Sequence, residues 1–272
     1  MKLSKKREMK NKKQKIIYYS DSLNDDFFSD DPIDNITINS DYKFIHRNIF
    51  FRFISFFIFY FIVCPLVWFY TRILLRIKFV NSKSIKKLKQ KCFIYGNHTG
   101  YIDAFIPNLL SWPKRNLIVV NPAAVSIKGL KTLVELLGVI PVPQSNNGMK
   151  EFISAIKYYQ GKKNITIYPE AHIWPYYTGV REYSNVSFSY PIKNNLPTIA
   201  FFTAFSKPKR FLSCFRKANM TVYVSDPFYP DLSLPKKEAQ DKIRNQVYNF
   251  MKEMSEKYSN YEVIKYVYKE KE

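Results

Sequence analysis

The chain is poor in cysteine and contains no paired cysteine motif. Its three cysteines, Cys64, Cys92 and Cys214, are scattered along 272 residues. An odd and scattered set argues against a disulfide framework and against a zinc site, and it suits a reducing compartment. Glycine is also scarce, at seven residues, and no glycine-rich phosphate loop or dinucleotide fingerprint occurs. We therefore expect a protein with no metal and no bound cofactor.

Acidic residues are few relative to basic ones. Lys and Arg number 43 against 22 Asp and Glu, so the formal net charge is +21. Such a balance favours polyanionic partners, either nucleic acid or an anionic membrane surface. Hydrophobic residues make up 46% of the chain. The length allows one domain of about 200 residues with extensions.

Residues 1–47 lack the apolar periodicity of a folded segment. A basic cluster opens this stretch, and a run rich in Asp, Asn and Ser follows it. Too few apolar side chains are present to offset the entropy that the chain would lose on folding. We therefore expect a polar, disordered N-terminal extension.

Residues 48–78 contain a long apolar run. From Phe53 to Thr71 nineteen residues carry no charge, and twelve of them are Phe, Ile, Leu or Val. Their insertion into a bilayer is favourable by roughly 4–7 kcal/mol, more than the ~3 kcal/mol that Pro65 costs in a regular helix. Two arrangements remain open, a single crossing and a re-entrant or in-plane hairpin. Basic residues on both flanks, together with Pro65, favour the hairpin, because a crossing would leave one basic flank outside.

Residues 79–272 alternate between strand-like and helix-like segments. The predicted strands are residues 92–95, 116–121, 139–142, 164–168, 198–204 and 220–225. The predicted helices are residues 102–110, 126–137, 148–159 and 241–257. This order predicts an α/β domain with a mostly parallel central sheet flanked by helices, preceded by the membrane-binding helical segment. In such domains sites gather at the carboxyl ends of the strands.

A histidine and an aspartate follow the first predicted strand of this domain. The run from Asn97 to Asp103 has the form N-H-x-x-x-x-D, and His98 is one of three histidines in the chain. A continuous helix would place His98 and Asp103 about 140° apart, so they can meet only if the chain bends between them. Asp103 would then hold one ring nitrogen protonated, and the other would accept a proton from a hydroxyl. The activated hydroxyl could attack an acyl thioester directly.

These motifs resemble those of the glycerolipid acyltransferases typified by 1-acylglycerol-3-phosphate acyltransferase. The family's N-H-x-x-x-x-D motif corresponds to Asn97, His98 and Asp103, and its F-P-E-G-T-R block to the run from Tyr168 to Ile173. The similarity extends over residues 79–258, with a membrane-binding segment before it. It implies His98 as the catalytic base, Asp103 as its partner, and Asn97 and Glu170 in the substrate site.

The chain departs from the family at two arginines that are thought to bind the acceptor phosphate. Gln144 stands in place of the first, and Ile173 in place of the second. Neither side chain can replace the bidentate fork of a guanidinium. His172, Arg181 and Lys128 are the candidate replacements.

The resemblance implies an acyltransferase that moves a fatty acyl group from acyl-CoA or acyl carrier protein to a lipid hydroxyl. The leading acceptor is lysophosphatidic acid, which would give phosphatidic acid in phospholipid biosynthesis. The missing arginines leave open a non-phosphate acceptor, such as a glycolipid or an amino-lipid. A non-catalytic basic protein that binds lipid or nucleic acid is the alternative of another class, although the apolar run argues against nucleic acid. We expect membrane lipids as partners, no nucleic acid, and a place on the cytoplasmic face of the cell membrane.

Overall fold

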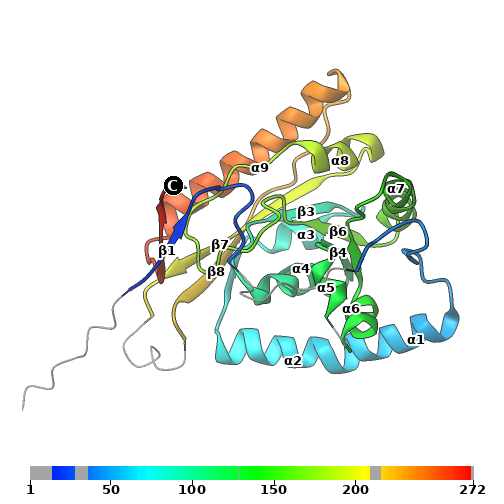
Figure 1. Ribbon diagram of the computed structural model, residues 1–272, viewed down its shortest axis with the longest axis horizontal. Coiled ribbons are helices and arrows are strands. Elements are labelled where there is room, and N and C mark those ends of the chain that lie inside the picture. The colour runs from blue at the N-terminus through cyan, green and yellow to red at the C-terminus, as the bar shows by residue number, and fades with distance from the viewer. Residues whose placement is uncertain (1–13, 28–35, 128, 209–215, 271–272) are drawn as a thin grey trace, which may run out of the picture.

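A seven-stranded sheet forms the centre of the molecule in the computed structural model (Figure 1). The structure describes residues 14–27, 36–127, 129–208 and 216–270. The strand order is β2-β8-β7-β3-β6-β4-β5, and every pairing is parallel except that between β7 and β8. The strands are β2 (Lys78–Val80), β3 (Phe93–Gly96), β4 (Asn116–Val120), β5 (Val139–Pro141), β6 (Asn164–Ile167), β7 (Thr198–Ser206) and β8 (Asn219–Val224). The predicted mixed α/β fold with a mostly parallel sheet is confirmed.

Helices cover both faces of this sheet. One face packs against α7 (Asn146–Gln160), α8 (Ser189–Asn194) and α9 (Lys236–Tyr258), and the other against α3 (Lys83–Lys87) and α4 (Ile106–Ser111). Two further helices, α5 (Ala123–Ser126) and α6 (Lys131–Leu137), lie between β4 and β5 in the chain. Alternation along β3 shows the two faces, since Phe93 and Tyr95 belong to one core cluster and Ile94 to the other. A sheet buried on both sides explains why its strands are continuously apolar.

The N-terminal segment is partly folded, which corrects the expectation of disorder for residues 14–27 and 36–47. Strand β1 (Lys15–Tyr19) pairs in parallel with β9 (Ile264–Tyr268) in a second, two-stranded sheet. Further along, Ile38 is fully buried in the main core, and its backbone N–H and C=O both bond to Gln144. The few apolar residues of this polar segment pack against residues more than 100 positions away in the chain. A periodicity within the segment cannot reveal such contacts.

The apolar segment forms one continuous helix, so the predicted hairpin is wrong. It consists of α1 (Ile49–Phe57), a π-helical stretch (Ile58–Val63), α2 (Cys64–Phe69) and a second π-helical stretch (Tyr70–Leu74). Pro65 lies in the first turn of α2, directly after the wider π-helical turns. Such turns accommodate a residue that lacks the backbone N–H, so the proline does not have to reverse the chain.

This helix lies along one side of the domain (Figure 1). It has 26 residues, and an 18-residue stretch within it has a mean hydropathy of 2.2, so it is long and apolar enough to cross a membrane. A narrow stripe containing Ser55, Phe59 and Thr71 is buried against the domain. Most of the other large apolar side chains on the helix are exposed, among them Phe50 at 75% and Leu66 at 63%. The helix therefore presents an uncovered apolar surface along its length.

Candidate active site

His98 and Asp103 meet at the carboxyl end of β3. His98 Nδ1 lies 3.2 Å from Asp103 Oδ2. A short 3-10 turn, Tyr101–Ala104, carries Asp103 back toward the histidine, as the predicted bend requires. The carboxylate is fully buried, and Oδ2 also accepts hydrogen bonds from the backbone N–H groups of Thr99 and Gly100. Backbone donors thus fix the carboxylate that orients the imidazole.

The imidazole of His98 has a fixed orientation. Its ring stacks on that of Tyr168 at 4.4 Å between centroids and 20° between planes. The Tyr168 hydroxyl donates to the backbone carbonyl of Asp103, and Phe201 packs edge-on against the tyrosine ring. Since Nδ1 faces the carboxylate, it carries the proton, and Nε2 is the nitrogen left to act as a base. The side chain of His98 remains 18% exposed.

Gly96 and Asn97 shape the end of β3. A Cβ added to Gly96 would lie 2.1 Å from the ring of Phe201, so only glycine allows this close approach. Asn97 is fully buried, and its amide bonds to the backbone of Thr203 on β7 in both directions. The structure therefore gives Asn97 the role of holding β3 against β7, and the side chain has no exposed surface for the substrate contact that we expected.

Glu170 forms a buried ion pair with Arg181. Arg181 Nε lies 3.4 Å from Glu170 Oε2, and the side chains are 2% and 1% exposed. Burial raises the pKa of the Glu170 carboxyl to about 7, while Arg181, followed by the nearby His98, acts in the opposite direction. Glu170 is thus close to His98. Its carboxylate faces Arg181 and backbone N–H groups, which indicates a positioning role in addition to the expected acceptor contact.

Arg181 is engaged by protein groups on every side. Its guanidinium donates to the backbone carbonyls of Glu170, His172 and Ser22. It also lies 4.9 Å from the ring of Trp174. A guanidinium bound in this way is not placed to bind an acceptor phosphate, although the sequence made it a candidate for that task.

The N-terminal segment covers the loop that follows Glu170. The indole of Trp174 donates to the backbone carbonyl of Asp25 at 2.7 Å, and the ring of Tyr19 lies 4.7 Å from it. Phe27 donates its backbone N–H to the carbonyl of Ile173. These contacts place residues 19–27 beside the block that resembles F-P-E-G-T-R, and only the tertiary structure reveals them.

The remaining sequence candidates lie at separate places in the chain. His172 Nδ1 lies 3.3 Å from Asp26 Oδ2, and its side chain is partly exposed. Gln144, which stands in place of the family's first arginine, accepts from the backbone N–H of Ile38. Lys128 lies outside the described residues. The structure therefore brings His98, Asp103 and Glu170 together, whereas His172 faces a carboxylate of the N-terminal segment.

Ala171 adopts a backbone conformation that favours glycine. Its φ is 62°, in the left-handed region, where a residue with a Cβ is disfavoured by about 1–2 kcal/mol. The corresponding position of F-P-E-G-T-R is the glycine. The strained turn directly follows Glu170 and directs the chain toward Trp174.

The fold and this site define a class of protein: an α/β enzyme domain with a histidine–carboxylate pair at the carboxyl edge of a parallel sheet. A family model described as Acyltransferase matches residues 76–201, the part of the chain that contains His98, Asp103 and Glu170. No curated protein matches the chain.

Among solved structures, the chain is similar to the 1-acyl-sn-glycerophosphate (LPA) acyltransferase PlsC from Thermotoga maritima. The two are 14% identical, with a TM-score of 0.49, and the match covers 79% of this chain and 98% of the other.

Proposed function

We propose that this protein transfers a fatty acyl group from a thioester donor to a lipid hydroxyl, with His98 as the general base. The observation that carries the proposal is the pair of His98 Nδ1 and Asp103 Oδ2, 3.2 Å apart. The pair lies within residues 76–201, which match the acyltransferase family. An imidazole that is held by a buried carboxylate is suited to deprotonating an alcohol.

The reaction needs no covalent enzyme intermediate. His98 Nε2 takes the proton of the acceptor hydroxyl as the alcohol oxygen attacks the thioester carbonyl. The tetrahedral intermediate then collapses, the carbon–sulfur bond breaks, and the imidazolium returns its proton to the leaving thiolate. Asp103 stabilises the imidazolium between these two steps and preserves the productive tautomer. Acyl-CoA and acyl carrier protein are both donors of the required chemistry.

Lysophosphatidic acid is the leading acceptor, and phosphatidic acid would be its product. This proposal is supported by the family match over the catalytic motif. Phospholipid biosynthesis is the process in which such a reaction belongs.

A second candidate is an acceptor without a phosphate group, such as a glycolipid or an amino-lipid. Two observations favour it. Arg181 uses its donors on Glu170, His172 and Ser22, and His172 faces the Asp26 carboxylate. Both side chains are engaged by protein groups, so neither replaces the family's phosphate-binding arginines, and this suits a headgroup without a phosphate.

The enzyme would act at the cytoplasmic face of the cell membrane. The helix Ile49–Leu74 is about 39 Å long at 1.5 Å per residue, and it contacts the domain near both ends through Ser55 and through Arg72, which donates to the carbonyl of Ile77. A helix attached to the domain in this way is suited to lying in the interface with its apolar face in the lipid. This arrangement supports attachment through one continuous helix that lies in the interface, in place of the expected hairpin.

An acyl-transfer assay with defined acceptors tests the proposal. Purified protein in detergent is given a labelled acyl thioester and either lysophosphatidic acid, a lyso-glycolipid or a lyso-amino-lipid. We expect His98→Ala to lose nearly all activity while remaining folded, and Lys157→Ala, an exposed change on α7, to keep it. A folded His98→Ala variant at the full rate would refute the assignment. Turnover of a lyso-glycolipid or lyso-amino-lipid in place of lysophosphatidic acid would select the second candidate.

A further inference from the structure

A large cavity lies at the end of the sheet where the parallel strands begin, opposite to the end that carries His98. Its volume is about 780 Å³, and it lies between α1 and the amino-terminal ends of the strands. His98 follows the end of β3, whereas Lys91, which lines the cavity, precedes its start. Lys91 and His98 are seven positions apart, which corresponds to about 23 Å of extended chain. The cavity is therefore separate from the site of acyl transfer.

Basic residues converge on this cavity because of the sheet topology. Strands β3, β6 and β4 are neighbours and run in parallel, so the residues that precede them meet at one edge. Each of these three strands is preceded by lysine or arginine, and α1 contributes one more arginine to the lining of the cavity. These residues are Lys91, Lys114, Arg115, Lys162, Lys163 and Arg52.

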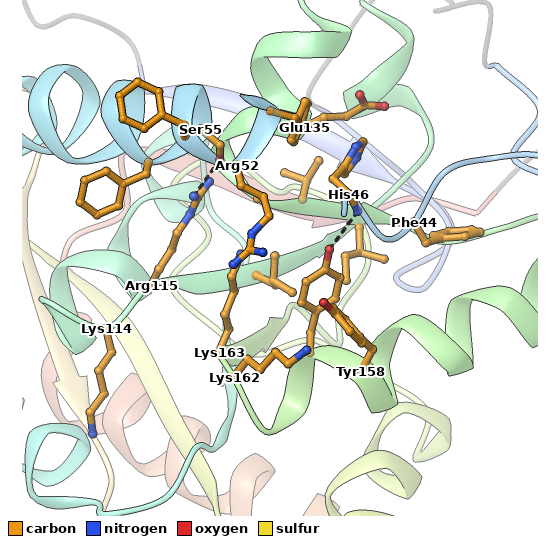
Figure 2. A pocket seen from close by; sticks show the side chains of 18 of the residues that line it. Phe44, His46, Arg52, Ser55, Lys114, Arg115, Glu135, Tyr158, Lys162 and Lys163 are labelled. Atoms are coloured by element: carbon orange, nitrogen blue, oxygen red, sulfur yellow. Dashed lines mark hydrogen bonds between the residues drawn. The ribbon is translucent and has the colours of Figure 1, made fainter. Parts of the chain in front are cut away.

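Three of these cations lie close together without a carboxylate beside them. Figure 2 shows Arg52, Arg115 and Lys163 between α1 and the sheet, whereas Lys114 points away and donates to the carbonyl of Leu88. Among the described residues, Arg52 and Lys163 form no salt bridge. The acidic residue of the lining, Glu135, accepts a hydrogen bond from Tyr42.

The charges of this cluster act against one another. Burial, followed by the neighbouring charges of Arg115 and Arg52, lowers the pKa of Lys163 to about 7. Arg115 donates to Ser55 and to the carbonyl of Leu136, yet its buried Nε has no partner in the described part of the chain. Unpaired cations around an open volume are a suitable site for a phosphate.

The same cavity has an apolar wall on the side of the exposed helix. Ile49, Phe53 and Phe56 of α1 line it, and all three also have substantial exposed surface. A ligand in this cavity could therefore place an anionic group on the basic residues and an acyl chain along α1. A free anion would leave the apolar wall unused.

We propose that this cavity binds the phosphate headgroup of an anionic phospholipid, as a second lipid site on the edge of the sheet opposite to His98. The bound lipid anchors the domain beside α1 and compensates the charges of Arg52, Arg115 and Lys163. The site stands on its own geometry and requires no catalytic activity, so it can be tested independently of the proposed reaction.

Titration calorimetry on the full-length protein in a neutral detergent tests this site. The probes are dihexanoyl phosphatidylglycerol, dihexanoyl phosphatidylcholine and inorganic phosphate. The test variant is Arg52→Gln combined with Lys163→Gln, because in the described part of the chain neither side chain forms a hydrogen bond or an ion pair, whereas that of Arg115 bonds to α1 and to the carbonyl of Leu136. The charge-matched control is Lys150→Gln combined with Lys157→Gln, two exposed positions of α7 outside the cavity.

We expect the wild type, the α7 control and His98→Ala to bind phosphatidylglycerol equally. The Arg52 and Lys163 double variant should bind it at least about tenfold more weakly while remaining folded. Equal binding by the double variant would overturn the proposal. Phosphatidylcholine bound as tightly as phosphatidylglycerol would also overturn it, and inorganic phosphate bound as tightly as the lipid would reassign the cavity to a soluble anion.

Discussion

Replacing Asp103 by asparagine tests the catalytic geometry most directly. The change keeps the size of the side chain and removes its charge. In the native site Asp103 Oδ2 accepts hydrogen bonds from His98 Nδ1 and from the backbone N–H groups of Thr99 and Gly100. The other oxygen, Oδ1, is buried and has no hydrogen-bond partner in the described part of the chain. An asparagine oxygen can replace Oδ2, but its NH₂ group would then occupy the place of Oδ1 without an acceptor.

The expected cost in stability follows from these contacts. Hydrogen bonds to a charged acceptor contribute about 1.5–3 kcal/mol, and neutral ones about 0.5–1.5 kcal/mol. Each of the two backbone hydrogen bonds should therefore weaken by about 1 kcal/mol, so the free energy of unfolding should fall by about 2 kcal/mol. This leaves the fold in place, because native domains are stable by about 5–15 kcal/mol.

The expected cost in catalysis is larger. Without the carboxylate, the imidazolium that forms in the reaction loses its stabilising charge, and the tautomer of His98 is no longer held. The corresponding Asp→Asn change in serine protease triads lowers kcat about 10⁴-fold, which is about 5.5 kcal/mol of activation free energy. Because Asp103 is fully buried and does not reach the substrate side of the ring, KM should change little.

The assay measures kcat and KM with a labelled acyl thioester, and urea unfolding of the same preparation. Asp231→Asn provides the matched control, since Asp231 is a surface carboxylate bonded to Lys242 and Ser233, far in the chain from the site. An Asp103→Asn protein whose kcat stays within threefold of the wild type would refute the assignment of Asp103 as the partner of His98.

Three further predictions follow from the described contacts. Ala171→Gly should raise the free energy of unfolding by about 0.5–1 kcal/mol in urea, because φ is 62° at this position and the strain there exceeds the entropic cost of glycine; a less stable variant would contradict this. The Glu170 carboxyl has a pKa raised from 4.5 to about 7, so it binds a proton more tightly when folded, and stability should fall by about 3 kcal/mol as the pH rises from about 4.5 to 7. Glu170→Gln should remove this dependence of the free energy of unfolding on pH. If urea unfolding at pH 5 and pH 8 gave the same difference for the variant as for the wild type, Glu170 would not be its cause. Phe50→Ser and Leu66→Ser should each weaken sedimentation with lipid vesicles about tenfold or more, whereas Val186→Ser, an exposed apolar position elsewhere, should not.

Local sequence patterns were sufficient for much of the domain. The six predicted strands correspond to β3, β4, β5, β6, β7 and β8, because each is a short apolar run bounded by polar or turn residues. Of the predicted helices, 148–159 and 241–257 lie within α7 and α9, whereas 126–137 is divided between α5 and α6. Strands β1, β2 and β9 were missed, since β1 and β9 stabilise one another across the whole chain.

The histidine–aspartate pair was also accessible from the sequence. His98 and Asp103 are five positions apart, and the bend between them uses residues of the same short run. The stacking of Tyr168 on His98 joins residues 70 positions apart, and the motif alone does not indicate it. The place of Tyr168 at the end of β6, adjacent to β3, was the signal that could have indicated this contact.

The amino-acid sequence by itself determined the alternation of elements, the histidine and its carboxylate partner, and the long apolar run, because these depend on neighbours along the chain. Only the tertiary structure decided the rest. Arg181 became the buried partner of Glu170 rather than a ligand for phosphate, Pro65 stayed within a continuous helix, and separate basic residues gathered at one edge of the sheet. These outcomes depend on which strands become neighbours and on what each side chain meets after packing, and no local pattern of residues specifies that.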